Sequence, residues 1–253
     1  MIGSEAIVVP PAMDIDYTSF VLYWGIGAAF FLVEWLWPAR RLEYRKVFLM
    51  DLFALGTYNL FFLTAVWITD RIAIPNYVPS PVQALPFLVK LIVFLLLIDL
   101  SAYWMHRLWH TTWFWRVHKW HHAPAYMYWL AGVRASLPQV VMAGIPYALW
   151  LPILKPVPSS FFVLYSAFLI VTNNWMHMNV AWRSRWLEWV FVTPRYHHIH
   201  HGDVPGFYMR NFGVVFTFWD RLFGTYADPE VAGKELRFGI QESAGPIRLA
   251  IGI

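Results

Sequence analysis

The sequence predicts an all-α integral membrane protein, a bundle of about four to five transmembrane helices with a histidine-rich cap on one side. Three observations predict this class. Hydrophobic residues make up 59% of the 253 positions and charged residues only 13%, whereas soluble domains carry about 25% charged residues. Several apolar runs approach the roughly 20 residues that a helix needs to cross a bilayer. All ten histidines lie between His106 and His201, at the ends of two such runs and beyond them.

The apolar runs predict a single membrane domain over residues 1–253. The third run is the most apolar, because the letters LIVFLLLI stand at its centre. The fourth and fifth flank a short proline-containing turn and therefore predict a hairpin. Pro146 and Pro152 predict kinks in the fourth, which membrane helices tolerate when neighbouring groups satisfy the backbone. The candidate transmembrane helices cover residues 18–37, 48–69, 86–105, 137–154 and 159–176.

Lysine and arginine predict the orientation of this bundle. Basic residues gather after the first, third and fifth candidate spans, whereas the opposite loops carry only Arg71 and Lys155, with Lys90 near the start of the third span. Segments rich in lysine and arginine face the cytoplasm in membrane proteins. We therefore expect a cytoplasmic C-terminus and a cytoplasmic metal-binding cap made of residues 106–136 and 177–253.

The histidines form three short patterns and one isolated position. On a helix, residues three or four apart share a face, so the histidines of one pattern can bind one ion. Three such clusters on one side of a membrane are costly without a cation, because buried imidazoles are desolvated and repel one another when charged. Their number exceeds the needs of one ion and predicts two. The patterns are His106 and His110; His118, His121 and His122; and His197, His198, His200 and His201, with His177 alone.

These residues leave the metal and the class of protein open. The chain has no cysteine, which excludes thiolate zinc sites, cysteine-ligated iron–sulfur clusters and a cysteine nucleophile. Imidazole suits iron, copper, nickel and zinc alike. A membrane oxygenase competes with a histidine-rich metal transporter or sensor, whose ligands would lie near the bilayer midplane. It also competes with a zinc-dependent membrane hydrolase, which would need Glu188 or Asp203 as its base.

Three segments resemble the fatty acid hydroxylase and sterol desaturase superfamily. They are residues 99–110 (DLSAYWMHRLWH), 115–122 (WRVHKWHH) and 193–202 (TPRYHHIHHG). Residues 210–213 (RNFG) and 219–225 (WDRLFGT) look like the C-terminal signature of that superfamily. The similarity covers roughly residues 97–226 and is nearest the branch of bacterial sterol-desaturase-like proteins and alkylglycerol monooxygenase.

The resemblance implies a non-haem di-iron enzyme that uses O2 and external electrons to hydroxylate or desaturate a C–H bond of a lipid. Zinc is expected as a substitute for iron in a purified sample. The implied partners are a lipid entering from the bilayer and a donor of ferredoxin, cytochrome or pterin type, without nucleic acid. A bacterial inner membrane is expected rather than the endoplasmic reticulum. No catalytic residue is implied beyond the metal ligands His106, His110, His118, His121, His122, His177, His197, His200 and His201, with His198 as a tenth ligand or a hydrogen-bonding neighbour.

Four further residues are expected around this metal centre. Metal-bound imidazole usually donates its other N–H to a carboxylate or carbonyl. Asp99, on the same face of the third span as its histidines, is therefore expected to contact a histidine of another cluster, with an ion pair to a neighbouring span as the alternative. Asn211 is expected in a similar supporting position. Tyr103 and Trp175 are expected to line a substrate cleft between the third and fifth spans, with packing between helices as the alternative.

Overall fold

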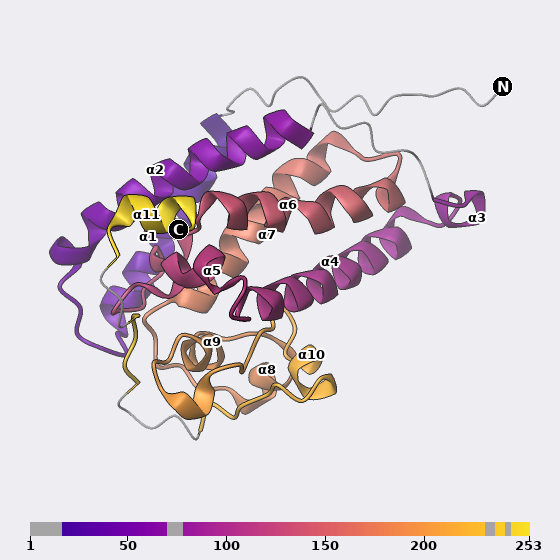
Figure 1. Cartoon of the computed structure of the whole chain (residues 1–253). Coiled ribbons are helices and arrows are strands. Elements are labelled where there is room, and N and C mark those ends of the chain that lie inside the picture. The colour runs from indigo at the N-terminus through magenta and orange to yellow at the C-terminus, as the bar shows by residue number, and fades with distance from the viewer. Residues whose placement is uncertain (1–16, 70–77, 231–235, 241–243) are drawn as a thin grey trace.

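The computed structural model describes residues 17–69, 78–230, 236–240 and 244–253. Within that part of the chain the regular structure is helical, apart from three isolated β-bridges. The long helices fill the upper part of the view in Figure 1, and the short helices between residues 185 and 222 lie together beneath them. The predicted all-α class is confirmed in the described residues.

The long helices fall close to the predicted apolar runs. Helix α4 extends four residues past the predicted end at 105, which places His106 on its last turn. Helix α6 ends at Trp150 and continues as the 3-10 turn η2 (Leu151–Leu154), because Pro152 has no N–H for a further α-helical hydrogen bond. Helix α1 packs on α7, and both α2 and α4 pack on α6. The five are α1 (Tyr17–Leu36), α2 (Tyr44–Thr69), α4 (Phe87–Trp109), α6 (Leu137–Trp150) and α7 (Ser159–His177).

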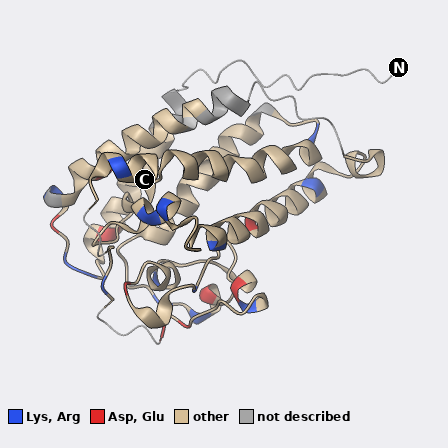
Figure 2. Ribbon diagram, in the orientation of Figure 1, with Lys and Arg blue, Asp and Glu red and all other residues tan. Residues whose placement is uncertain are grey.

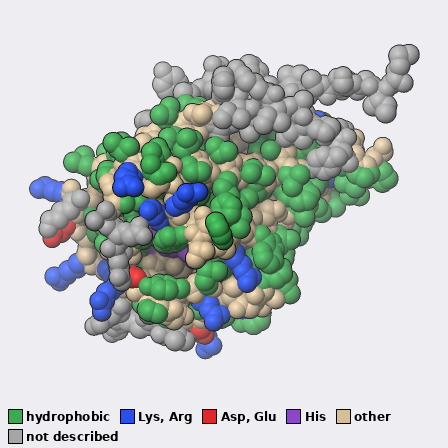
Figure 3. All heavy atoms as spheres, viewed as in Figure 1, with side chains coloured by type: hydrophobic (Ala, Val, Ile, Leu, Met, Phe, Trp, Pro, Cys, Tyr) green, Lys and Arg blue, Asp and Glu red, His purple; other side chains and the backbone are tan. Residues whose placement is uncertain are grey.

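Two stretches of the described residues are long and apolar enough to cross a membrane, Phe87–Trp109 and Leu137–Leu154. Shorter apolar stretches cover Val21–Leu36 and Val47–Phe61. Large hydrophobic side chains of α4 such as Leu88 and Ile92 are exposed, and hydrophobic side chains cover much of the face shown in Figure 3. An exposed apolar surface of this extent suits lipid rather than water. The helices thus support membrane association, while the number of spans stays a prediction.

Short elements with local start signals build the other end of the molecule. Thr193 begins α9 by accepting the N–H of Tyr196, and Pro194 occupies the first helical position, where a missing N–H costs nothing. Charged residues are sparse along the long helices and frequent near these short elements (Figure 2). The short elements are α3 (Ser80–Gln83), α5 (Trp115–His122), η1 (Ala131–Val133), α8 (Arg185–Val190), α9 (Pro194–His200), η3 (Pro205–Phe207), α10 (Phe218–Leu222) and α11 (Pro246–Ile251).

Candidate metal centre

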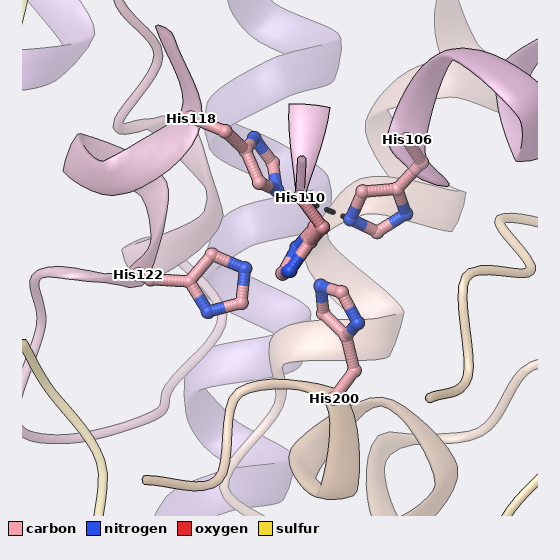
Figure 4. A group of neighbouring side chains, drawn as sticks. All are labelled: His106, His110, His118, His122 and His200. Carbon is pink, nitrogen blue, oxygen red and sulfur yellow. Dashed lines mark hydrogen bonds between the residues drawn. The ribbon is translucent and has the colours of Figure 1, made fainter. Parts of the chain in front are cut away.

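Nine of the ten histidines converge in two groups where the long helices meet the short ones. In each group, one ring nitrogen from every member lies within 4.8 Å of the others. Each group takes its members from several elements of the fold. Figure 4 shows the larger group, whose five rings gather around one centre. The five-histidine group is His106, His110, His118, His122 and His200; the four-histidine group is His121, His177, His197 and His201.

Helix α5 divides its histidines between the two groups. His118 and His122 belong to the five-histidine group, whereas His121 belongs to the four-histidine group. Adjacent positions on an α-helix point about 100° apart, so His121 and His122 diverge although both lie near the face of His118. The expectation that this whole pattern binds one ion is therefore wrong. Helix α9 shows the same division, with His197 in one group and His200 in the other.

Pairs of Nε2 atoms face each other at the spacing that one bound ion requires. The Nε2 atoms of His106 and His118 are 3.1 Å apart in the five-histidine group. In the other group, His177 Nε2 lies 3.3 Å from that of His121 and 3.2 Å from that of His197. Two nitrogens bound side by side to one ion at about 2.1 Å lie about 3 Å apart. The spacing thus matches neighbouring ligands of a single metal.

Backbone carbonyls fix which nitrogen of the ring carries the hydrogen. His177 Nδ1 lies 2.6 Å from the carbonyl of Asn173, and His121 Nδ1 lies 3.3 Å from that of Arg134. Because a carbonyl only accepts, each Nδ1 must be the donor, which leaves a bare lone pair on each Nε2. The two lone pairs of His121 and His177 then point at each other and repel unless a cation lies between them. This arrangement is the strongest indication of a metal in the structure.

The five-histidine group has the same construction. His106 Nδ1 donates to the carbonyl of Phe212 and His200 Nδ1 to that of Arg210, both at 3.0 Å. The Nε2 atoms of His110, His122 and His200 are buried and have no hydrogen-bond partner in the described part of the chain. Buried polar atoms without partners are rare in folded proteins. A bound metal would satisfy all three.

Burial keeps the histidines of the short helices neutral. Desolvation is the largest cause that holds the pKa of each well below its usual value, and repulsion from neighbouring histidines adds to it. Neutral imidazole is the form that binds metals. The rings are therefore available as ligands without first losing a proton. This holds for His118, His121, His122, His197, His200 and His201.

The segment from Arg210 to Phe212 carries two of the accepting carbonyls and is anchored by Asp220. This fully buried carboxylate accepts the backbone N–H of Phe212 at 2.8 Å and of Gly213 at 2.7 Å. It also accepts the hydroxyls of Tyr196 and Thr225. Sequence reasoning assigned Asp220 no role. The one feature of the sequence that could have indicated it is the position of this acidic residue within the aromatic segment 219–225.

Asn211 lies in the same segment, and its side chain forms no hydrogen bond with any histidine that the structure describes. Its backbone has a φ of 57°, a left-handed conformation that asparagine tolerates better than most residues. The side-chain amide donates to the carbonyl of Tyr196 on α9 at 3.1 Å. Asn211 therefore supports the ligands indirectly, by joining the segment that bears the accepting carbonyls to the helix that bears His197 and His200.

In the described part of the chain, Asp99 forms no hydrogen bond with a histidine, contrary to expectation. Its carboxylate accepts the backbone N–H of Val215 at 2.9 Å and of Phe216 at 3.1 Å, and the indole N–H of Trp219 at 2.9 Å. Asp99 lies two turns before His106 on α4, which places it beside residues 215–219 rather than beside the histidine rings. Among the described residues, none of the ion pairs includes Asp99 either, so the alternative of a pair with a neighbouring span gains no support. Asp99 instead attaches the loop after residue 213 to the long helices.

Tyr103 and Trp175 pack between elements. The Tyr103 side chain is fully buried, with its hydroxyl 2.7 Å from that of Thr225 and its ring stacked on Phe223. Trp175 donates its indole N–H to the carbonyl of Val192 at 2.9 Å. These contacts agree with packing between helices, the alternative to lining a substrate cleft. The structure therefore gives no support at Tyr103 for the predicted cleft between α4 and α7.

His198 belongs to neither group. Its Nδ1 lies 3.3 Å from a guanidinium nitrogen of Arg40, and its ring meets that of Phe238 edge to face. Burial, with a smaller contribution from Arg40, lowers the pKa of His198 to about 3. The ring is thus a neutral acceptor for Arg40.

Glu34 of α1 connects two segments beside the four-histidine group. Its buried Oε1 accepts the backbone N–H of Trp129 and that of Asn179, both at 2.7 Å. Trp129 precedes η1, and Asn179 follows His177 by two residues. One carboxylate therefore fixes both η1 and the end of α7, which lie in contact.

Gly132 in η1 provides a steric test of the four-histidine group. A Cβ at this position would overlap the Nδ1 and Cε1 atoms of His177, so Gly132→Ala must displace that ring. We expect the variant to bind about one metal ion fewer per chain. Gly144→Ala in α6 is the control, because a Cβ there has nothing within 4 Å. Mass-spectrometric metal analysis of anaerobically purified protein measures both, and equal metal contents would contradict the placement of His177 among the ligands.

The fold and the site together define a class: an all-helical protein with apolar membrane helices and two buried histidine groups suited to metals. Comparison with known families agrees. The chain belongs to the fatty acid hydroxylase family, whose sequence pattern matches residues 91–225. The resemblance noted in the sequence is confirmed, and the matched region contains all nine grouped histidines.

Curated relatives are lipid oxygenases by name. An alkylglycerol monooxygenase of Danio rerio is 30% identical over 153 residues, which is 60% of this chain and 33% of the relative. Methylsterol monooxygenase 1-3 of Arabidopsis thaliana is 26% identical over 204 residues, 79% of this chain and 68% of the relative. Ornithine lipid hydroxylase OlsE of Rhizobium tropici is 29% identical over 150 residues, which is 57% of this chain and 44% of the relative. The chain spans about a third of the length of the Danio rerio enzyme, and no solved structure matches it.

Proposed function

We propose that the protein is a multi-pass membrane oxygenase that hydroxylates or desaturates a C–H bond of a lipid, using O2 and electrons from an external donor. One observation carries the proposal. The Nε2 atoms of His121 and His177, each with an unshared lone pair, face each other at 3.3 Å. With Nδ1 of both rings donating to carbonyls, a metal ion bound between the two Nε2 atoms would make that contact favourable. The names of the family relatives supply the reaction type and the lipid class of substrate.

The residues present fit a pair of irons with nitrogen ligands. One ion would be held by the five-histidine group and one by the four-histidine group. Two irons so placed would supply the redox chemistry needed to reduce O2 and oxidise a C–H bond. The chain contributes rigid ligand positions through the carbonyls that bind Nδ1, and it excludes water by burying the rings.

Access to the site is proposed on the side of His110. His110 is half-buried, while every other member of the two groups is buried. Figure 3 shows histidine surface at the bottom of a recess on the viewed face. O2 and a lipid would then reach the five-histidine group past His110, the least buried member of the two groups. The chain has no cysteine for an iron–sulfur cluster of its own, so a separate donor of ferredoxin, cytochrome or pterin type completes the proposal.

The competing functions lose support from particular contacts. A zinc hydrolase needs a carboxylate base free to act beside the metals. Glu188 is instead paired with Arg195 at 3.2 Å, and Asp203 accepts the hydroxyl of Tyr208 at 2.7 Å. A metal transporter places its ligands within the spans. Here the groups lie at the ends of α4 and α7 and on the short helices α5 and α9.

The bundle of four to five spans, the cytoplasmic cap and C-terminus, and the bacterial inner membrane belong to this proposal. The basic residues near the short helices support the orientation, because such residues mark the cytoplasmic side. Fusing a reporter that is active only in the cytoplasm to the C-terminus tests the orientation. An inactive, fully expressed fusion would reverse it.

The reaction itself is tested with isotopic oxygen. Protein loaded with Fe(II), placed in lipid nanodiscs and supplied with a chemical reductant should consume 18O2 and yield a lipid product. Mass spectrometry should find one 18O atom in a hydroxylated lipid, or the loss of two hydrogens in a desaturated one. The zinc-loaded protein is the control and should yield neither, because zinc has no redox chemistry. Equal products from both preparations would contradict the oxygenase assignment.

A further inference from the structure

A cavity of about 580 Å³ opens beside the end of α1, outside the two histidine groups. Positively charged and apolar side chains both line its wall. Three arginines, Arg40, Arg41 and Arg237, meet apolar side chains that include Met127 and Phe238. Glu43 also lines the cavity, so among the described lining residues three arginines meet one carboxylate. A positively charged wall next to an apolar one suits an amphiphile with an anionic head.

The mouth of the cavity lies where a lipid headgroup would be expected. Trp35 and Trp37, at the end of α1, are 66% and 56% exposed and stand just before Arg40 in the chain. Exposed tryptophans at the end of an apolar helix mark the boundary between hydrocarbon and headgroups. Arginine directly beyond that boundary is placed to meet lipid phosphates.

Arg40 is held in place but has no carboxylate partner. Asn179 fixes its backbone on both sides, accepting the N–H at 3.0 Å and donating to the carbonyl at 2.7 Å. The guanidinium stands 4.9 Å from the centre of the Phe238 ring and contacts neutral His198. None of the ion pairs among the described residues includes Arg40, Arg41 or Arg237. A half-buried guanidinium without a counter-charge is costly, so an anion from outside the chain is expected.

We propose that this cavity binds the phosphate of an anionic lipid headgroup, with the apolar wall against the start of its chains. The cavity adjoins the metal centre, because Arg40 contacts His198 and the residue before it, His197, belongs to the four-histidine group. That the bound lipid is the substrate rests on the proposed function. The binding itself does not.

The test measures lipid retention on the full-length protein by native mass spectrometry. Phosphatidylglycerol and phosphatidylcholine with the same acyl chains are supplied in equal amounts, since both carry the phosphate but only the first is anionic. We expect roughly a 25-fold preference for phosphatidylglycerol, because Arg41 and Arg237 should each contribute roughly fivefold near the membrane surface. Arg41→Gln/Arg237→Gln should lose most of this preference, and both side chains are exposed, so the fold should be unaffected.

The control removes the same charge elsewhere. Arg116→Gln/Arg248→Gln alters two exposed arginines of α5 and α11 that do not line this cavity, and it should keep the preference. Equal losses in both double variants, or no preference in the unmodified protein, would overturn the proposal. Displacement of the lipid by millimolar inorganic phosphate would reassign the cavity to a soluble phosphate and overturn the lipid source. An inactive protein that still prefers phosphatidylglycerol would overturn only the oxygenase function.

Discussion

His200→Ala should remove the metal of the five-histidine group, and His197→Ala that of the four-histidine group. Each substitution deletes one ring whose Nε2 faces the proposed ion, and both residues lie on α9, one turn apart. Because the groups use different residues, each single variant should retain about one metal ion per chain, and the double variant close to none. Loss of either ion should abolish turnover, since the proposed reaction uses both.

His198 supplies a matched control for these variants. It is buried on the same short helix, between the two substituted residues, but points to Arg40 rather than to either group. His198→Ala should therefore keep both ions. Metal analysis of the four proteins, purified side by side without oxygen, separates the outcomes. Full metal content in the His197→Ala/His200→Ala protein, or an equal loss in His198→Ala, would contradict the division into two groups.

Asp220→Ala should cause the second largest effect, on stability and metal together. The substitution leaves the backbone N–H groups of Phe212 and Gly213 buried without their acceptor. Each buried donor left unsatisfied costs about 1–3 kcal/mol, so we expect a loss of at least about 2 kcal/mol in the free energy of unfolding. The carbonyl of Phe212 orients His106, so the five-histidine group should also bind its metal more weakly.

Asp228→Ala is the control for this prediction. Asp228 lies eight residues further on and accepts one exposed backbone N–H, from Glu230, at 2.9 Å. Thermal unfolding in detergent, with metal bound and after chelation, should show a large decrease for Asp220→Ala and little change for Asp228→Ala. An Asp220→Ala protein that unfolds at the temperature of the unmodified chain and keeps its metal would show that the 210–213 segment does not depend on this carboxylate.

The periodic and compositional features of the sequence were sufficient for the helices and for the convergence of the histidines. Apolar runs predicted the long helices to within a few residues, because long helices of this composition are determined locally. The nine histidines that the family resemblance implied as ligands are the nine that the structure brings together. Their assignment to one side of the bundle followed from their positions at the ends of two apolar runs.

Other features depend on loop conformation and could not be predicted from spacing. Nothing in the sequence shows that Asp99 and Asp220 both bind backbone N–H groups of one loop, because that loop has no period. The division of α5 between two groups depends on where the neighbouring helices lie. The cavity beside Arg40 joins the end of α1 to residues near position 237, almost 200 positions away. Such contacts arise only from the tertiary fold.

The central claim is two iron ions bound by histidine nitrogens, and X-ray absorption at the iron edge tests it most directly. The protein is loaded anaerobically with Fe(II) and its iron content is measured on the same sample. The account predicts two irons per chain, each with a shell of nitrogen ligands at about 2.1 Å and the multiple-scattering pattern of imidazole. A single iron per chain, or a shell of oxygen ligands without imidazole scattering, would contradict it.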